Sequence, residues 1–347
     1  MSSKIIIFKN DRTGDLITSL PAINLIIKKN KGKEILIYLS EINYRMKFLF
    51  NYENVNIKKV NYKLSFLNRL NILYQFTISK ISEVYILRPK NFFFLLPIFF
   101  YFKYIKFYGF CLNGINSYKR PSEFLRKFLT GYVINDRGTP TKRISRKKLH
   151  LKLVGFNVEK KLPDEEYNFE ISNKLKEILP KDYLLIHYKK KIFNELGWGI
   201  DGLEKIIKKI LEYYPSVVLI NDIEPSNDQL IFKKKFKWYD LSNNTSETKT
   251  SKVLYLPNIS GLDMFNAIKL SKKTIAVHGT ITLLGNLLRV PILDIFYCNI
   301  KNNDDFYRYK NAFHEWKPND INYNFIVPSK NLNKTINKML FSFKNEK

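Results

Sequence analysis

The stretch that decides the fold is residues 5–27, IIIFKNDRTGDLITSLPAINLII. It begins with a short β-type run, so we expect a strand at residues 4–8. Beyond it, Leu16, Leu20, Ile23 and Ile27 recur at spacings of four, three and four, as one face of a helix requires. A Gly between a strand and a helix permits a tight turn, and we place that turn at Thr13 and Gly14. The segment therefore predicts one β–α unit of a parallel sheet.

Asp15 follows this turn, at the edge of the sheet where the strands end. Open α/β sheets bind their ligands at that edge. A carboxylate there can accept a proton from a substrate hydroxyl, as a general base does. Asp is also a good helix N-cap, and residue type alone favours the cap.

The β–α alternation then occurs twice along the chain. We expect strands in the first half at residues 34–40, 55–60, 83–87 and 104–108, and in the second half at residues 183–187, 217–220, 253–256, 274–277 and 291–296. At 347 residues the chain exceeds the usual size of one core. The predicted fold class is α/β, with two doubly wound Rossmann-like domains that face each other across a cleft.

The predicted domains cover residues 1–165 and 166–328, with the linker somewhere in residues 156–175, a region that includes Pro163. Residues 329–347 form a final element, with a helical pattern at residues 331–343. We leave open whether this helix packs back on the first domain.

A second candidate site is the run VHGT, residues 277–280, which opens a helix in the second half. Gly279 gives access to the backbone, and Thr280 and Thr282 add hydroxyls. The free N–H groups and the dipole of a helix start favour phosphate oxygens. His278 is a further donor to phosphate, although a structural histidine is an equally good interpretation.

Residues 5–27, with their strand, Gly-Asp and Ser-x-Pro-Ala, resemble the opening of the ADP-heptose:lipopolysaccharide heptosyltransferases and their relatives. The likeness extends to residues 83–110, to LLIHYKKK and LGW, and to residues 260–296. It implies a GT-B fold and transfer of a sugar from a nucleotide-sugar to a lipopolysaccharide or other envelope glycan. In this likeness Asp15 matches the general base, the VHGT loop receives the nucleotide diphosphate, and Glu224 binds the ribose.

The chain departs from that family at three positions. His278 stands where the family has Asp, Leu283 where it has His, and Leu196 where it has a Lys two residues before Trp198. We expect Lys189, Lys190 or Lys191 to replace the missing lysine, because a flexible ammonium can reach a phosphate from several backbone positions. A solvated basic run is the commoner role for three consecutive lysines. The altered residues also permit a binding protein that has lost catalysis.

Composition points to anionic partners. Lys and Arg number 59 against 31 Asp and Glu, a net charge of +28, which attracts nucleic acid, anionic lipid or a phosphorylated glycan. A compositional bias of the genome explains the charge equally well. No nucleic-acid motif accompanies it, so we expect an anionic glycan or glycolipid acceptor and no specific nucleic acid.

The expected compartment follows from the ends and the apolar runs of the sequence. The opening apolar run is too short for a signal peptide, and only two cysteines occur, so we expect a cytoplasmic protein, peripheral on the membrane at most. The most apolar stretch, Phe92–Phe102, is shorter than the ~20 residues of a membrane span. We interpret it as a buried helix, with a membrane-dipping element as the alternative.

Two cofactor motifs are missing and one is misplaced. No Asp-x-Asp and no P-loop occurs, so we expect no metal and no cofactor besides the nucleotide-sugar co-substrate. Gly197, Gly199 and Gly202 have the spacing of a dinucleotide fingerprint, with Asp222 at the usual distance. These glycines do not directly follow a strand, so a nicotinamide dehydrogenase is a weak alternative.

Overall fold

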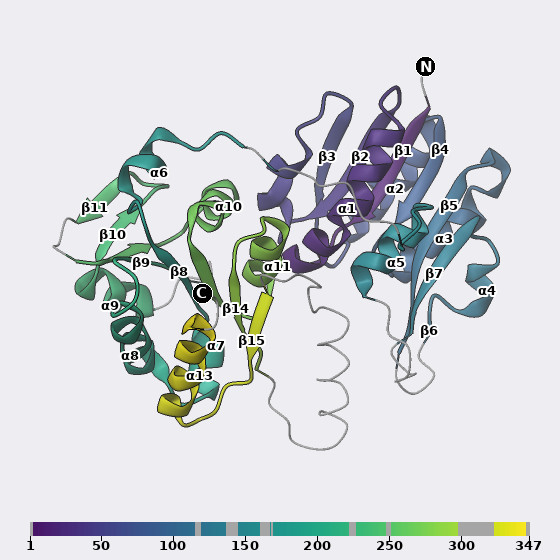
Figure 1. Ribbon diagram of the computed structural model, residues 1–347. Coiled ribbons are helices and arrows are strands. Elements are labelled where there is room, and N and C mark those ends of the chain that lie inside the picture. The colour runs from purple at the N-terminus through teal and green to yellow at the C-terminus, as the bar shows by residue number, and fades with distance from the viewer. Residues whose placement is uncertain are drawn as a thin grey trace. The chain divides into compact units, whose positions relative to one another are not determined.

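The computed structural model describes residues 3–114, 119–136, 145–159, 167, 169–221, 227–247, 251–297 and 323–344 (Figure 1). They form two compact units, and the division falls between Glu159 and Tyr167. Each unit is a parallel-dominated sheet covered by helices, so the predicted α/β class with two doubly wound sheets is confirmed.

The sheet of the first unit has the order β3-β2-β1-β4-β5, with β6 and β7 both paired to β5. All of its pairs are parallel except that of β6 with β5. The strands are β1 (Lys4–Lys9), β2 (Glu34–Ser40), β3 (Val55–Val60), β4 (Ile81–Ile86), β5 (Lys106–Asn113), β6 (Lys119–Arg120) and β7 (Gly131–Asp136). The helices are α1 (Thr13–Lys29), α2 (Phe66–Ile78), α3 (Asn91–Phe99), α4 (Glu123–Arg126) and α5 (Arg146–Leu153), with 3₁₀ turns η1 (Tyr44–Phe50) and η2 (Tyr101–Lys103).

One face of this sheet is packed with aromatic rings. Phe8 of β1 stacks on Tyr38 of β2 and on Phe93 of α3, with ring centroids 5.1 and 4.1 Å apart. Phe76 of α2 lies over the same face and is fully buried. These contacts hold β1 at the centre of the unit, and with it the start of α1.

The strand expected at residues 104–108 begins later than predicted. Tyr104 ends η2 in the left-handed region, with φ 52°, so the extended backbone of β5 starts only at Lys106. Strand β7 was not predicted, because its sequence, GYVIND, alternates too weakly to stand out.

The sheet of the second unit has the order β11-β10-β12-β9-β8-β13-β14-β15, and among its described strands only the β10–β11 pair is antiparallel. Its strands are β8 (Leu184–Tyr188), β9 (Val217–Asn221), β10 (Lys237–Asp240), β11 (Thr245–Glu247), β12 (Val253–Leu256), β13 (Lys273–Val277), β14 (Ile292–Ile295) and β15 (Tyr323–Ile326). Its helices are α6 (Asn173–Ile178), α7 (Lys190–Glu195), α8 (Gly199–Ile210), α9 (Asn227–Lys235), α10 (Gly261–Leu270), α11 (Thr280–Leu287) and α13 (Leu332–Lys344).

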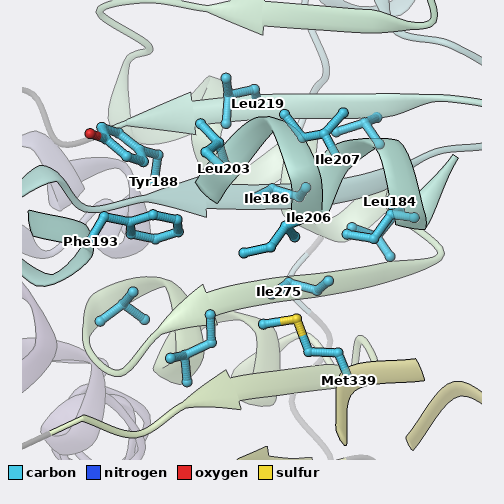
Figure 2. Packing of buried hydrophobic residues seen from close by; sticks show 14 of the residues in the cluster. Leu184, Ile186, Tyr188, Phe193, Leu203, Ile206, Ile207, Leu219, Ile275 and Met339 are labelled. Atoms are coloured by element: carbon cyan, nitrogen blue, oxygen red, sulfur yellow. The ribbon is translucent and has the colours of Figure 1, made fainter. Parts of the chain in front are cut away.

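The core of the second unit joins the sheet to α8 and α13 (Figure 2). Leu203, Ile206 and Ile207 of α8 are buried against the strands, as their spacing predicts. Ile336 and Met339 of α13 belong to the same cluster. The final helix therefore packs within the second unit, on α8 and β15.

The apolar stretch Phe92–Phe102 divides into two parts. Phe93, Phe94 and Leu96 of α3 are buried, which agrees with a buried helix. Phe99 and Phe102 at its end are exposed. In the part of the chain that the structure describes, no helix combines the length and apolarity needed to cross a membrane.

Candidate functional site

In the first unit the candidate site lies where β1 ends and α1 begins. Arg12 is the N-cap residue of α1 and makes no side-chain cap, while Asp15 is the third residue of the helix. Interpreting Asp15 as the N-cap is therefore wrong. Gly14 is already helical and is not among the glycines with positive φ, so the tight turn expected at Thr13 and Gly14 is also wrong.

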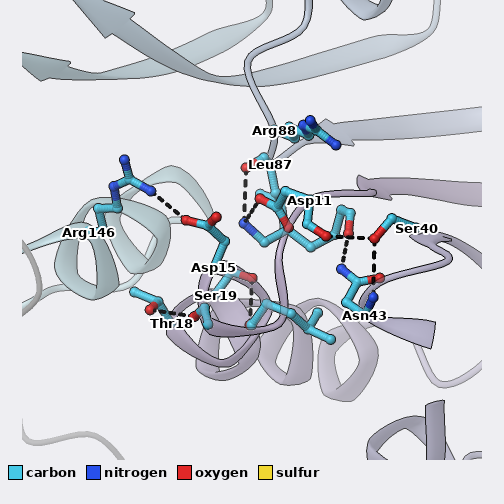
Figure 3. Close-up of polar contacts among 12 residues, drawn as sticks. Asp11, Asp15, Thr18, Ser19, Ser40, Asn43, Leu87, Arg88 and Arg146 are labelled. Carbon is cyan, nitrogen blue, oxygen red and sulfur yellow. Dashed lines mark hydrogen bonds and ion pairs between the residues drawn. The ribbon is translucent and has the colours of Figure 1, made fainter. Parts of the chain in front are cut away.

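The carboxylate of Asp15 is held by an arginine. Its Oδ1 accepts a hydrogen bond of 2.6 Å from Nη1 of Arg146, the first residue of α5 (Figure 3). The Asp15 side chain keeps 19% of its surface exposed. The first turn of a helix favours negative charge, so Asp15 is an oriented, ionisable carboxylate that a ligand can reach.

A second carboxylate lies beside it. Oδ2 of Asp11 accepts from Nζ of Lys9 at 2.8 Å, while Oδ1 is buried and has no hydrogen-bond partner among the described residues. Burial raises the pKa of Asp11 to about 6, and the Lys9 charge acts in the opposite direction. Because Asp11 is buried, it suits substrate contact less well than Asp15.

The loop between β1 and α1 is fastened to the loop after β2. Ser40 Oγ donates to the carbonyl oxygen of Asp11 at 2.6 Å, and Asn43 Nδ2 donates to that of Lys9 at 2.7 Å (Figure 3). Thr13 Oγ1 donates to the Ile42 carbonyl at 3.3 Å. Thr13, proposed from the sequence as part of the site, thus serves to position the loop.

Cations surround the two carboxylates. Arg88 lies near Asp11 and Asp15. Its guanidinium stacks over the Tyr62 ring, 4.0 Å from the centroid, and donates a hydrogen bond to the Tyr62 carbonyl. Burial, together with the neighbouring charges of Arg88 and Arg69, lowers the pKa of Lys90 to about 8. Positive charge is thus concentrated at this edge beyond what the two carboxylates neutralise.

In the second unit the VHGT loop joins β13 to α11, as expected. Nδ1 of His278 lies 2.7 Å from Oδ2 of Asp294, a fully buried residue of β14. Tyr323 OH donates to the same oxygen at 2.7 Å. This contact occupies Nδ1 of His278 and leaves Nε2, the other ring nitrogen, for a ligand.

The start of α11 is open on the backbone side. Gly279 is the N-cap residue and has no side chain to cap the first N–H groups. Thr280 is half-buried, whereas Thr282 is fully buried and donates its hydroxyl to Oδ1 of Asp294 at 3.2 Å. The expectation that the Thr282 hydroxyl binds phosphate is therefore wrong.

The three lysines after β8 have different surroundings. Lys190 Nζ pairs with the buried Asp228 at 2.8 Å, and Tyr188 OH also donates to Asp228. Lys191 is largely exposed and lies 4.0 Å from Glu195. Lys189 is half-buried, is the N-cap residue of α7, and makes no ion pair with the described residues. Since β8 is the parallel neighbour of β13, Lys189 and His278 lie at the same edge of the sheet.

Leu196, at the position where the heptosyltransferase family has a lysine, is part of the core. Leu196 and Trp198 are buried, and Trp198 Nε1 donates to the Ser329 carbonyl at 3.2 Å. The glycines of the dinucleotide-like spacing follow α7 and not a strand. A Cβ at residue 202 would lie 2.5 Å from Trp198 Cβ, so packing against Trp198 explains the glycine at this position.

The predicted ribose-binding carboxylate, Glu224, lies outside the described residues, as does Asp222 before it. Across the described ranges, no group of three or more His, Cys, Asp or Glu side chains could hold a metal ion.

Sequence reasoning missed Asp11, Arg146 and Arg88 in the first unit and Asp294 and Tyr323 in the second. Asp294 carried a usable signal, because it is an acid inside the apolar strand run Ile292–Ile295. Arg146 carried none, because nothing local distinguishes it from the basic residues around it.

Comparison with known proteins rests on structure alone, because no protein-family model and no curated protein sequence matches the chain. E. coli ADP-heptose lps heptosyltransferase II matches with a TM-score of 0.64 and 12% identity, over 99% of this chain and 98% of that one. E. coli heptosyltransferase WaaC, with ADP-2-deoxy-2-fluoro heptose, matches with a TM-score of 0.62 and 11% identity over 99% and 100%.

The chain has the GT-B-like fold of the heptosyltransferases. The fold is shared more widely, since a UDP-GlcNAc 2-epimerase from Methanocaldococcus jannaschii matches with a TM-score of 0.54 and 12% identity, over 98% of this chain and 92% of that one. The fold is thus established across nearly the whole chain, and the activity has to be argued from the residues.

Proposed function

We propose that this protein is an inverting glycosyltransferase that moves a sugar from a nucleotide-sugar to an anionic glycan or glycolipid of the cell envelope, on the cytoplasmic side. The observation that carries the proposal is the oriented, partly exposed carboxylate of Asp15 at the carboxyl edge of the first sheet, in a chain with the heptosyltransferase fold.

The first unit is proposed to hold the acceptor. The cations close to Asp11 and Asp15 suit an acceptor that carries phosphate or carboxylate groups; they are Lys9, Arg88, Lys90 and Arg146. An anion there would replace the water that these partly buried cations have lost.

The second unit is proposed to hold the donor, with its diphosphate at the start of α11. The uncapped N–H groups, Nε2 of His278 and the ammonium of Lys189 would contact the phosphate oxygens. Asp294 has an indirect part, because it fixes the ring of His278.

In the proposed reaction the acceptor oxygen attacks the anomeric carbon of the donor sugar. The bond from that carbon to the diphosphate oxygen breaks, and the diphosphate leaves with the electron pair. The hydroxyl proton passes to the Asp15 carboxylate, with Arg146 holding that carboxylate in place. Attack from the face opposite the leaving group inverts the anomeric centre. The protein's own positive groups stabilise the departing charge, so we propose that transfer does not depend on a metal.

A second candidate is a binding protein with the same fold and no turnover. Specific observations favour it: Leu196 is buried where the resembling family has a lysine, and the Thr282 hydroxyl is committed to Asp294. Such a protein would bind a nucleotide-sugar and leave it intact.

The experiment that separates the two is a screen in two stages. A thermal-shift screen with nucleotides and nucleotide-sugars identifies ligands, because binding to the folded state raises its stability. Each ligand found is then incubated with the protein and phosphorylated glycolipid acceptors, and release of the nucleoside diphosphate is measured. Transfer supports the enzyme, binding without release supports the binding protein, and no binding by any nucleotide contradicts both.

A further inference from the structure

Helix α2 exposes an apolar stripe. Phe66, Leu70, Tyr74 and Ile78 recur every four residues, and their side chains are 72%, 45%, 60% and 56% exposed. The opposite side of the helix is anchored in the core by Ile72 and Phe76. A surface helix normally turns polar residues outward, so a second apolar side needs an explanation.

The turn η2 continues the stripe at the C-terminal end of α2. Lys103 Nζ donates to the carbonyl oxygens of Phe76 and Thr77 at 2.7 and 2.6 Å, which fixes the turn beside the helix end. Around it Tyr101, Phe102 and Tyr104 are 75%, 68% and 93% exposed. We define the aromatic patch as the exposed large apolar residues of α2, of the end of α3 and of η2 with its C-cap: Phe66, Leu67, Leu70, Tyr74, Ile78, Phe99, Tyr101, Phe102 and Tyr104.

The sequence that builds the patch is almost free of acids. Residues 64–122 contain one acid, Glu83, which pairs with Lys33, and eight basic residues: Arg69, Lys80, Arg88, Lys90, Lys103, Lys106, Lys119 and Arg120. Large exposed apolar patches mark interaction sites. This one has positive charges on its own elements, Arg69 in α2, Lys80 just after α2 and Lys103 in η2. Its partner should therefore be both apolar and anionic.

An anionic lipid surface has both properties. Tyr and Phe side chains favour the headgroup level of a bilayer, and an apolar helix side can lie in that interface without crossing it. Each Lys or Arg close to an anionic surface adds about 1 kcal/mol of attraction. A second copy of the chain fits less well, since it would bring two basic surfaces together. Nucleic acid fits less well too, because Leu67, Leu70 and Ile78 neither stack on bases nor hydrogen-bond to them.

We propose that the first unit docks on an anionic membrane through the aromatic patch, with the side chains of α2 and η2 inserted at the headgroup level and the surrounding lysines and arginines on the lipid phosphates. This goes beyond the proposed transfer reaction and does not require it, because docking is measured without turnover.

The test is flotation of the full chain with vesicles of phosphatidylglycerol and phosphatidylcholine in equal parts, and with vesicles of phosphatidylcholine alone. Two triple variants remove the patch in different places: Phe66→Ser with Leu67→Ser and Leu70→Ser, and Tyr101→Ser with Phe102→Ser and Tyr104→Ser. The matched control is Tyr213→Ser with Phe341→Ser, which removes exposed aromatic side chains of the second unit.

We expect binding to the anionic vesicles, a loss of at least about 10-fold in partitioning for each triple variant, and no change for the control. Part of the binding should survive 0.5 M NaCl, because salt does not screen apolar insertion. A folding defect in one variant would leave the other as a valid test. Unchanged melting temperatures of both variants would show that they fold normally.

Three outcomes overturn the proposal. The first is vesicle binding by both triple variants equal to that of the unmodified protein. The second is a dimer in solution that the triple variants dissociate, which assigns the patch to a second copy. The third is no vesicle binding but retention of single-stranded DNA that the variants lose. Failure of the transfer assay with intact vesicle binding would reject the proposed function and leave this inference in place.

Discussion

Arg146 and Asp15 lie 131 positions apart in the sequence, yet they form a 2.6 Å ion pair at the start of α1. The packing of α5 against α1 brings them together. The pair orients the carboxylate while part of it stays exposed, as a general base that must reach its substrate requires.

Replacing the base tests this role. Asp15→Asn keeps the shape of the side chain but removes its basicity, so we expect turnover to fall by about 100-fold or more while nucleotide affinity stays within about twofold. Transfer kinetics with a verified substrate measure both. Near-normal turnover in a folded Asp15→Asn protein would show that the carboxylate is structural.

Arg146→Gln provides the companion experiment. It retains the base and removes its positioning partner, so we expect a smaller decrease in turnover, roughly 10-fold, and a shift in the pH profile of turnover. A loss as large as that of Asp15→Asn, with an unchanged pH profile, would contradict a positioning role for Arg146.

The carboxylate of Asp294 accepts hydrogen bonds from three side chains, so its removal should release His278. We expect Asp294→Asn to weaken nucleotide binding by about 10-fold, because the ring loses the acceptor that sets its tautomer. Titration calorimetry with the nucleoside diphosphate measures the effect. Tyr323→Phe is the control, since it removes one donor to Asp294 and leaves the His278 contact. Equal affinities for Asp294→Asn and the unmodified protein would exclude His278 from the donor site.

The lysines after β8 can be separated by their surroundings. We expect Lys189→Ala to lower nucleotide-diphosphate affinity by about 5- to 10-fold and Lys191→Ala to leave it unchanged, because Lys191 is exposed and lies near Glu195. A similar loss in both variants would indicate a diffuse effect of charge, which raising the salt concentration would then abolish.

The buried Asp11 predicts a pH-dependent difference in stability. Its pKa rises from 3.8 to about 6 on folding, so between these values the folded state binds more protons than the unfolded state. This contribution is fully present below pH 3.8 and is lost as the pH rises through about 6. The free energy of unfolding of the unmodified protein, minus that of Asp11→Asn, should therefore decrease by up to ~3 kcal/mol between pH 4 and pH 7. Urea denaturation at several pH values measures it, and a flat or rising difference would contradict the burial of the charge.

The sequence by itself determined the fold class and the central strands of both sheets. Local periodicity predicted β1 and β12 and the buried side of α8, because an apolar spacing is a property of neighbouring residues. Ser260 caps α10 by accepting from the Asp263 N–H at 3.1 Å, a contact that spans three residues. Such features form within one turn or one strand, so they can be read without knowing what packs against them.

The tertiary structure alone decided which polar groups meet. Lys190 forms an ion pair with Asp228, and Thr282 donates a hydrogen bond to Asp294. The local sequence had predicted both residues as ligand contacts. The same holds for α13, whose apolar residues could cover either domain until Ile336 and Met339 are seen in the core of the second unit. The physical reason is that a buried charge or hydroxyl takes the partner that folding brings within about 3 Å, and chain separation does not limit that choice.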